Sequence, residues 1–341
     1  MRNPDHSETY DGGIWCIIVV TLPPPKGGTK EKNMDTRWTR RDWLTLTAGT
    51  TAVTGLLAAG NPRAAETVPA EKVGALPPAE YKLGMVTYQM GKDMTCDQLI
   101  DLCRKAGLAG VELRSTHAHG VEDRLSPAER SDIRARFADA GVAIAGLGTA
   151  FEFHSRDENK VRENIEGAKS YAKLAADVGA PGIKVRPNGV ERGDDPQKAF
   201  ERIGRALGEV ARYAADLGVQ VWLEVHGSEQ TRNTANVATI IRHADHPNAR
   251  VCWNSNEGET DASGSIRPAF DHVRDFIGEV HINEIGRPIY PWRELFDLLR
   301  EIRFTGYCLA EINYNPEPER FMRYYRTLFD CFTDRYADPK A

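Results

Sequence analysis

Residues 200–226, FERIGRALGEVARYAADLGVQVWLEVH, contain the pattern that decides the fold. Apolar side chains recur at steps of three and four residues in the first part of this stretch, which predicts an amphipathic helix. The members of this stripe are Phe200, Ile203, Leu207, Val210, Ala214 and Leu217. Gly218 then ends the helix, and the apolar run at 219–225 predicts a buried strand. A helix that leads through a glycine into a buried strand is the repeating unit of an alternating α/β fold.

The same unit recurs along the chain. Short apolar runs, each followed by a helical pattern, lie at 82–88, 110–113, 142–147, 182–185, 219–225, 250–253, 279–282 and 307–312. Strand followed by helix, eight times over about 255 residues, predicts a single (β/α)8 TIM barrel at 82–336. An open doubly wound sheet is the alternative. It is disfavoured because the first strand leads into VTYQMG at 86–91, which lacks the glycine-rich phosphate loop of such sheets.

Composition excludes several classes of protein. The chain has 341 residues, 41% of them hydrophobic, and a net charge of -5, which together support a sizeable core and exclude a wholly disordered chain. A nucleic-acid binder would usually carry a basic excess, and no apolar run reaches membrane-spanning length, so neither nucleic acid nor a polytopic membrane topology is expected. The six cysteines form no CxxC pair, which argues against zinc ribbons and disulfide scaffolds. Cys96 and Cys103 are expected to share the buried face of one helix.

The residues before the barrel are typical of an export leader. Arg40 and Arg41 precede an uncharged stretch at 43–59 that is rich in threonine, alanine, glycine and leucine. Small residues follow and offer cleavage points, so a twin-arginine signal peptide is predicted at 34–65. We therefore expect a periplasmic or extracellular protein with no stable membrane insertion after the signal is cleaved.

Three further segments flank the signal and the barrel. Residues 66–81 contain three prolines and predict a flexible linker, and 337–341 form a short tail. Because a signal peptide should start near the terminus, we expect translation to begin at Met34 and residues 1–33 to be untranslated or disordered. N-terminal sequencing of the precursor tests this expectation.

Polar residues end four consecutive predicted strands, where the active sites of TIM barrels lie. The strand ends read LEVH at 223–226, VCWN at 251–254, HIN at 281–283 and AEIN at 310–313. Since residues i and i+2 share a strand face, three pairs of side chains are expected to point inward. These pairs are Glu224 with His226, His281 with Asn283, and Glu311 with Asn313.

Two carboxylates buried together in a barrel mouth are costly unless a cation compensates them. A divalent ion held by mixed nitrogen and oxygen ligands is the economical solution, and Mn²⁺, Mg²⁺, Co²⁺ and Zn²⁺ suit such ligands. Each of these residues taken alone is more often structural, as a rim salt bridge or a core histidine. Their convergence from successive strands is what predicts a site.

Four blocks of the sequence resemble a known family. LEVHG at 223–227, VCWN at 251–254, HINEIGR at 281–287 and LAE at 309–311 are similar to motifs of the xylose isomerase-like sugar phosphate isomerase/epimerase superfamily, whose ketose 3-epimerases are the best-understood branch. The resemblance covers roughly 82–336. It implies a TIM barrel that binds a divalent metal, Mn²⁺ by preference, and acts on a small carbohydrate by removing a proton beside a carbonyl through an enediolate.

The resemblance also implies roles for individual residues. Glu224, His281 and Glu311 would hold the metal, and the two glutamates would act as acid and base. Arg287, six residues after the histidine, would contact the substrate.

Two positions depart from the family pattern. Asn254 stands where the family has a metal-binding aspartate, and Glu257 stands where it has a substrate-contacting histidine. An asparagine can ligate through its carbonyl oxygen but removes one negative charge. Glu257 can supply a charge in its place, either as ligand or as base.

Further polar residues near the strand ends are candidate contacts to a carbohydrate. They are His117, His119, His154, Lys184, Arg186 and His226. An exported protein with such a polar mouth also suits a lyase acting on 3-keto-glycosides, which removes the same α-proton but expels the aglycone. A sugar-binding barrel without catalysis stays open because of Asn254. An endonuclease IV-like phosphodiesterase would need a richer histidine and aspartate set and a basic face. The sequence leaves a homo-oligomer open.

Overall fold

Eight parallel strands close into a barrel in sequence order, with β1 paired to β2 and to β8. The computed structural model describes residues 76–336. The strands are β1 Lys82–Val86, β2 Gly110–Arg114, β3 Ala143–Glu152, β4 Gly182–Arg186, β5 Gln220–Glu224, β6 Ala249–Asn254, β7 Ile277–Ile282 and β8 Tyr307–Ala310. This confirms the predicted single (β/α)8 TIM barrel.

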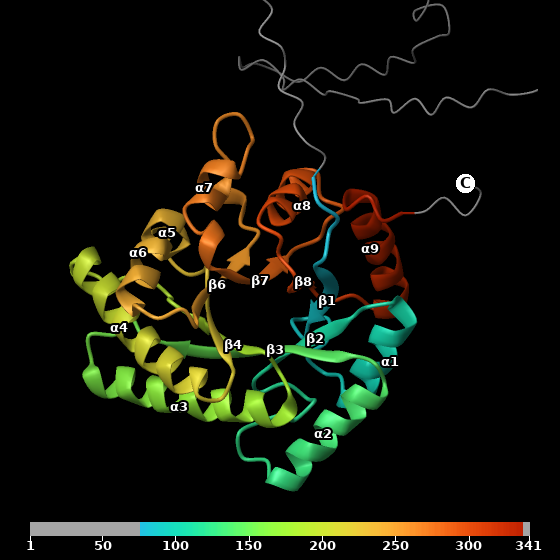
Figure 1. Ribbon diagram of the computed structural model, residues 1–341, viewed down its shortest axis with the longest axis horizontal. Coiled ribbons are helices and arrows are strands. Elements are labelled where there is room, and N and C mark those ends of the chain that lie inside the picture. Colours follow the sequence, from blue (N-terminus) through green and yellow to red (C-terminus); the bar gives the residue numbers. More distant parts are fainter. Residues whose placement is uncertain (1–75, 337–341) are drawn as a thin grey trace, which may run out of the picture. The chain divides into compact units, whose positions relative to one another are not determined.

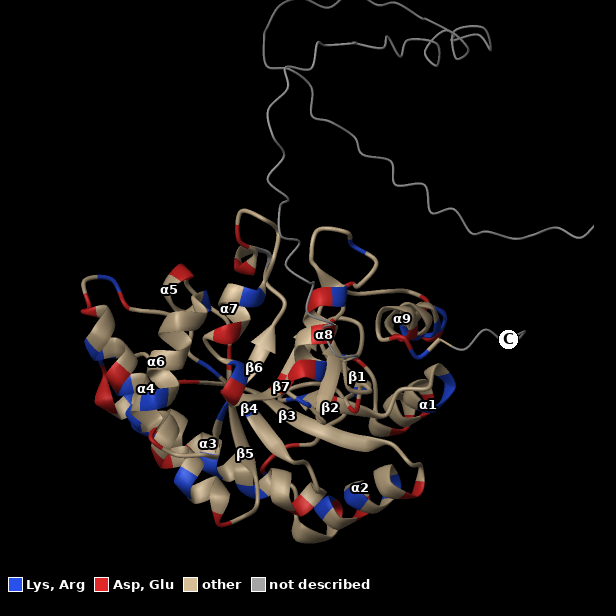
Figure 2. Cartoon of the chain, turned by 45° about the horizontal axis from the view of Figure 1, so that its top comes forward, with Lys and Arg blue, Asp and Glu red and all other residues tan. Residues whose placement is uncertain are grey.

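Helices surround the barrel on its outside (Figure 1). They are α1 Cys96–Ala106, α2 Pro127–Asp139, α3 Glu158–Val178, α4 Pro196–Ala215, α5 Glu229–Arg232, α6 Thr234–Ala244, α7 Arg267–Asp271, α8 Trp292–Glu301 and α9 Pro318–Phe332, with 3-10 turns η1 Glu257–Glu259 and η2 Arg274–Phe276. Figure 2 shows most lysine, arginine, aspartate and glutamate residues on these helices, whose outer faces meet solvent. Within the described residues, no helix combines the length and the apolar character that crossing a membrane requires.

Local sequence fixes where several helices begin and end. Thr95 and Ser126 start α1 and α2 with capping boxes, in which the side chain and the third helical residue satisfy each other's backbone N–H groups. Gly107 and Gly179 end α1 and α3 in the left-handed conformation that glycine adopts without strain. Cys103 on α1 is fully buried with Cys96 nearby on the same face, as the sequence predicted.

The apolar stripe of α4 packs inward as predicted. Helix α6 packs against α4 at two glycines of α4. All members of the stripe within α4 are buried. Gly204 and Gly208 lie where the two helices touch, and a Cβ atom on Gly208 would overlap the backbone of Ala244. Close helix contact therefore depends on the missing side chain at this position.

The interior of the barrel changes from aromatic at its base to polar at its mouth. The Trp222 ring fills the base, where Gly146, Gly182 and Gly278 leave room for it. Farther along the strands, charged and polar side chains such as Glu112, Lys184 and Glu224 lie inside the barrel beside a small apolar cluster of Val86, Ala145 and Leu309. The Trp222 ring is almost fully buried at this end of the barrel.

Several boundaries differ from those expected. β3 runs to Glu152 rather than to 147, because Glu152 pairs with Arg186 both in the strand ladder and through a 2.9 Å ion pair. Between β6 and β7 the structure has the short helix α7 and the 3-10 turns η1 and η2 in place of one long helix. The predicted signal peptide at 34–65, residues 1–33, most of the linker at 66–81 and the tail at 337–341 lie outside the described residues.

Candidate active site

Four polar side chains meet at the mouth of the barrel. Glu224 and Asn254 are the last residues of β5 and β6, His281 is the next to last of β7, and Glu311 directly follows β8. The ladder places Asn254 beside His281, and the Glu311 amide donates to the carbonyl of Ile282 on β7. Glu224, Asn254 and His281 are buried, whereas Glu311 is partly exposed. The structure thus brings together all four residues that the sequence predicted as metal ligands.

The imidazole of His281 lies between the two glutamates. Its Nδ1 atom is 3.7 Å from Glu224 Oε1 and 3.8 Å from Glu311 Oε2, and it has no hydrogen-bond partner among the described residues. One ligand atom from each of the three residues lies within 4.8 Å of the others. A buried nitrogen without a partner that faces two carboxylate oxygens fits a divalent cation.

Asn254 does not face this position as a ligand would. Its Nδ2 atom donates to Glu224 Oε1 at 3.2 Å, so the amide acts as a hydrogen-bond donor. The amide would have to turn before its oxygen could bind an ion. The possible metal ligands are therefore Glu224, His281 and Glu311. Asn254 is an uncharged neighbour that donates a hydrogen bond to Glu224.

Each glutamate has a cation on its other oxygen. Lys184 Nζ lies 2.7 Å from Glu224 Oε2, and Arg114 Nη1 lies 3.5 Å from Glu311 Oε1. Burial raises the pKa of Glu224, but the charge of Lys184 and the contact with His281 outweigh it and hold that pKa well below its usual range. Glu224 is consequently a carboxylate at neutral pH.

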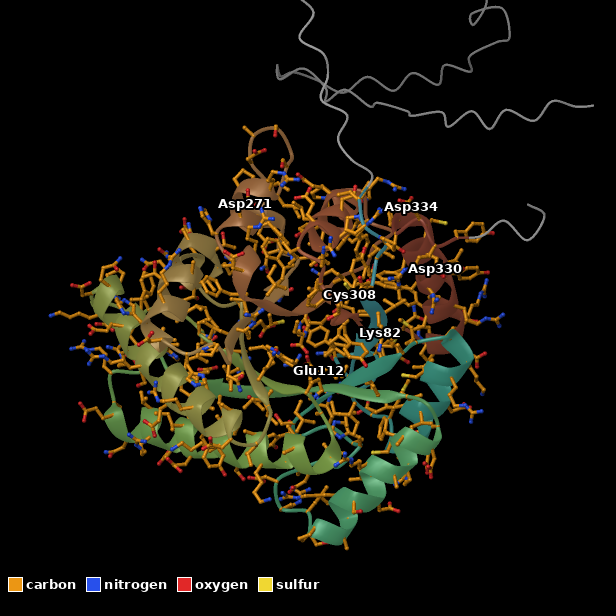
Figure 3. The ribbon with its side chains drawn as sticks, viewed as in Figure 1. Lys82, Glu112, Asp271, Cys308, Asp330 and Asp334 are labelled. Atoms are coloured by element: carbon orange, nitrogen blue, oxygen red, sulfur yellow. The ribbon has the colours of Figure 1, made fainter. Side chains whose placement is uncertain are left out.

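A second layer of acidic groups lies beneath the imidazole. Glu112, on β2, accepts a 2.9 Å hydrogen bond from His281 Nε2, and Figure 3 places it in the interior of the barrel. This bond places a proton on Nε2 and turns Nδ1 toward the glutamates. Burial lowers the pKa of His281, but the neighbouring Cys252 and Glu112 outweigh it and hold that pKa well above its usual value. Glu279, on β7, has both oxygens buried without a hydrogen-bond partner among the described residues, and its Oε2 lies 3.7 Å from His281 Nε2. Burial and the neighbouring Glu112 raise the pKa of Glu279 well above its usual value, which favours its uncharged form.

Sequence reasoning missed Glu112, Glu279 and the partner of Lys184. Glu112 and Glu279 interrupt apolar strands rather than ending them, and a charged residue inside a buried strand is the signal that could have found them. Lys184 was expected at the mouth as a contact to the substrate. Its side chain is only 1% exposed because the long methylene chain reaches inside the barrel to Glu224.

Two predicted contacts from β3 and β4 form a cluster at the mouth. Arg186 binds Glu152, and His154 Nδ1 lies 3.6 Å from the other oxygen of that glutamate. All three side chains are partly exposed, so a ligand entering the barrel can reach them.

The other predicted histidines have different surroundings. His226 is half-buried, its Nδ1 has no partner among residues 76–336, and burial lowers its pKa, which favours a neutral ring. His117 Nδ1 lies 3.1 Å from the Thr87 hydroxyl and the ring is half-buried. Both ring nitrogens of His119 are hydrogen-bonded to backbone, one to the Arg114 carbonyl and one to the Val121 amide, so His119 fixes the loop after β2.

The remaining predicted contacts lie in loops. Arg287 is exposed in the loop after β7, and the side chain of Glu257 in η1 lies outside what the structure describes. Asn283 donates to the Ser255 carbonyl after β6, so its amide joins two loops, and Asn313 is exposed.

A buried acid that the sequence did not single out joins two loops beside the mouth. Glu259 accepts hydrogen bonds from the Tyr290 hydroxyl at 2.8 Å and from Asn256 Nδ2 at 3.1 Å, and Trp253 Nε1 donates to the same hydroxyl. Burial raises the pKa of Glu259 to about 8. This group links the chain after β6 to the chain before α8.

The arrangement is suited to moving protons on a bound molecule. Two carboxylates face one small space from different strands, so one can remove a proton while the other delivers one. Glu311 is the more exposed of the two and lies nearer to solvent.

Comparison with known proteins relates the chain to one family and to several solved structures. A family model described as xylose isomerase-like TIM barrel matches residues 100–328. No curated protein sequence matches the chain significantly.

The solved structures share the barrel at low sequence identity. An L-ribulose 3-epimerase is 18% identical, with 74% of this chain and 95% of that chain covered and a TM-score of 0.62. The 3-keto-D-glucoside 4-epimerase from E. coli is 17% identical, with 74% and 100% covered and a TM-score of 0.62. The IolI protein with a bound zinc atom is 18% identical, with 75% and 99% covered and a TM-score of 0.56. At these identities the similarity shows the fold.

Proposed function

The chain belongs to the xylose isomerase-like TIM barrel family, and on that premise we propose that it is a sugar isomerase or epimerase that moves a proton beside a carbonyl group. The observation that supports this most strongly is the pair of carboxylates, Glu224 and Glu311, on either side of His281 Nδ1. Structural neighbours that carry the names of sugar 3- and 4-epimerases are consistent with it.

The two glutamates would divide the proton transfer between them. One carboxylate removes the proton from the carbon next to the carbonyl, which leaves an enediolate. The other glutamate returns a proton, to the opposite face of the same carbon for an epimerisation or to the neighbouring carbon for an isomerisation. Because the groups come from β5 and β8, they can approach a sugar from two sides.

Three atoms of the chain would hold a divalent ion: His281 Nδ1, Glu224 Oε1 and Glu311 Oε2. Asn254 would join them only if its amide turned. Mn²⁺ is the preferred ion, and Mg²⁺, Co²⁺ and Zn²⁺ share these ligand types. Such an ion, when bound, polarises a carbonyl or hydroxyl oxygen of the substrate and stabilises developing negative charge.

The hydroxyl groups of a sugar would be bound around the mouth. His226, Arg186 and His154 are partly exposed there and offer donors and acceptors for hydroxyls. Arg287 and Glu257 remain proposed contacts from the loops after β7 and β6.

Conversion of free ketoses tests the proposal. The purified protein is incubated with D-fructose, D-psicose, D-tagatose and L-ribulose, with and without Mn²⁺, and the products are separated by chromatography. We expect at least one sugar to be converted to its epimer or isomer. Binding of these sugars in calorimetry without conversion of any of them would instead support a sugar-binding barrel that has no activity.

A 3-keto-glycoside lyase is the second candidate, favoured by the likeness to a 3-keto-D-glucoside 4-epimerase. A glutamate removes the proton α to the ketone, the glycosidic carbon–oxygen bond breaks, and its electron pair leaves with the aglycone oxygen, which takes up a proton. A 3-keto-glycoside with a chromogenic aglycone separates the candidates, since only the lyase releases the chromophore. The predicted export would suit such a substrate and stays a prediction.

A further inference from the structure

A cavity of about 780 Å³ lies at the base of the barrel, where the strands begin. Its wall includes the first residues of β5, β7 and β8, the start of β6, and the chain that leads into β7 and β8. Because the strands are parallel, this cavity lies at the opposite rim from Glu224, His281 and Glu311. Its volume is in the range of pockets that hold small organic molecules, about 300–1,000 Å³. The proposed function makes no use of it.

The inner wall of the cavity carries polar atoms without a partner. Glu279, which is 1% exposed, has two carboxyl oxygens without a hydrogen bond to any described residue, and Arg250 has a buried Nε that also lacks one. Trp222 forms part of the same wall, and its Nε1 donates to Gln220 Oε1 at 2.8 Å. Buried polar groups in native proteins are nearly always hydrogen-bonded, so unpaired ones beside a cavity are satisfied by something that enters it.

The charges around the cavity favour an anion. Three arginines line it, Arg250, Arg274 and Arg303, and the acids on its wall are Asp275 and Glu279. Burial, followed by the neighbouring Glu112, raises the pKa of Glu279 well above its usual value and favours its uncharged form. Positive charge therefore exceeds negative charge on this wall.

Two of these arginines are available to a ligand. Arg274 is held by Asp271 at 3.1 Å, whereas Arg250 and Arg303 form no ion pair within residues 76–336. Arg250 is half-buried and donates to the Ile277 carbonyl at 3.3 Å. Arg303 is exposed at the rim of the cavity and adopts a left-handed φ of 53° just after α8, where glycine is the usual residue. A side chain kept in an unfavourable backbone conformation is consistent with a use for its guanidinium group.

We propose that this cavity binds a small organic phosphate, with Arg250 and Arg303 as the contacts of its phosphoryl group. Arginine suits this group because the planar fork of N–H donors matches two phosphate oxygens. The rest of the molecule would lie toward Trp222 and Glu279, whose free oxygens can accept from hydroxyl groups. The site is separate from the proposed function and does not depend on it.

Calorimetric titration of the full chain with inorganic phosphate and with D-glucose 6-phosphate tests the site. Arg303→Gly removes a cation and relieves the backbone, so it keeps the fold, and Arg250→Gln removes the inner cation. Arg320→Gln is the matched control, because Arg320 is an arginine at the start of α9 that pairs with Glu317. Arg186→Gln removes a cation from the mouth instead.

We expect the parent chain to bind one molecule of D-glucose 6-phosphate with a Kd of about 1 mM or lower, and inorganic phosphate more weakly. Arg303→Gly and Arg250→Gln should each weaken binding about 10-fold, with no change in Arg320→Gln and Arg186→Gln. The proposal is overturned if the parent chain gives no saturable binding, or if Arg303→Gly binds as the parent chain does. Loss of binding in Arg186→Gln alone would place the anion at the mouth and would also refute it.

The indole N–H signal of Trp222 locates the ligand by NMR. This signal is identified by its loss in Trp222→Phe, and it should shift when D-glucose 6-phosphate is added to the parent chain. An unchanged signal at saturation would contradict the proposed position. A parent chain that converts no sugar would refute the proposed function and leave these binding results as they are.

Discussion

The hydrogen bond between Glu112 and His281 decides which ring nitrogen faces the two glutamates. A carboxylate can only accept, so Nε2 must carry a proton, and Nδ1 is the nitrogen that faces the glutamates. Glu112→Gln offers an amide N–H to Nε2, and Glu224 and Glu311 would then draw the ring proton to Nδ1. We expect the tautomer of His281 to switch, with a loss of activity of about 10- to 100-fold.

Nitrogen-15 chemical shifts of the imidazole ring report the tautomer directly. Glu122→Gln is the matched control, because Glu122 is also a buried glutamate but binds Tyr171 and the Thr116 amide away from the site. Ring shifts of His281 that are the same in Glu112→Gln and in the parent chain would show that Glu112 does not fix the ring.

Glu259 should make the stability of the protein depend on pH. Its pKa is about 8 in the folded protein against 4.5 as the ordinary value, so between these values the unfolded chain has released a proton that the folded chain retains. The free energy of unfolding therefore falls as pH rises through this range, by at most about 1.4 kcal/mol per unit from this group, and levels off above pH 8.

Urea unfolding of the parent chain and of Glu259→Gln at pH 6 and pH 8 isolates this contribution. The variant keeps a neutral group at the position, so it should lose less stability between the two pH values than the parent chain. Equal losses in both proteins would mean that Glu259 does not bind its proton more tightly in the folded state.

At the scale of elements, the close contact of α4 with α6 depends on Gly208. A side chain there would overlap the Ala244 backbone, so Gly208→Val should lower the free energy of unfolding by about 1–3 kcal/mol. Gly286→Val is the control, because the nearest atom to a Cβ there is 3.9 Å away. Chemical denaturation measures both, and an equal effect of the two substitutions would contradict this account of the helix contact.

The elements could be predicted because their patterns are local. Alternating apolar runs and glycine helix ends identified all eight strands, and the stripe in α4 is buried as expected. Boundaries such as the extension of β3 depend on a neighbour, since Glu152 is held in the ladder by Arg186 on β4. Sequence periodicity within one segment carries no information about that partner.

The site could be predicted in part because some of its residues stand at the ends of strands that the sequence identifies. Strand-end residues such as Glu224, His281 and Glu311 converge because every parallel strand ends at the same rim. Glu112 was not predicted, and Lys184 was predicted only as a contact to the carbohydrate. Their contacts inside the barrel depend on side-chain direction and join residues that are 169 and 40 positions apart in the sequence.

At the scale of the whole molecule, the barrel brings acids from separate strands to one mouth, with the Trp222 ring buried toward the base. Only a closed barrel places β5, β7 and β8 so that their polar ends surround one space. The central claim is that this space is where a proton leaves and rejoins a sugar carbon.

Exchange of deuterium from D₂O into the carbon beside the carbonyl of the best ketose substrate, followed by NMR, tests that claim most directly. The parent chain should incorporate deuterium, and Glu311→Gln, with an unchanged melting temperature, should do so at least about 100-fold more slowly. Exchange at a near-normal rate in Glu311→Gln, or none in the parent chain, would contradict it.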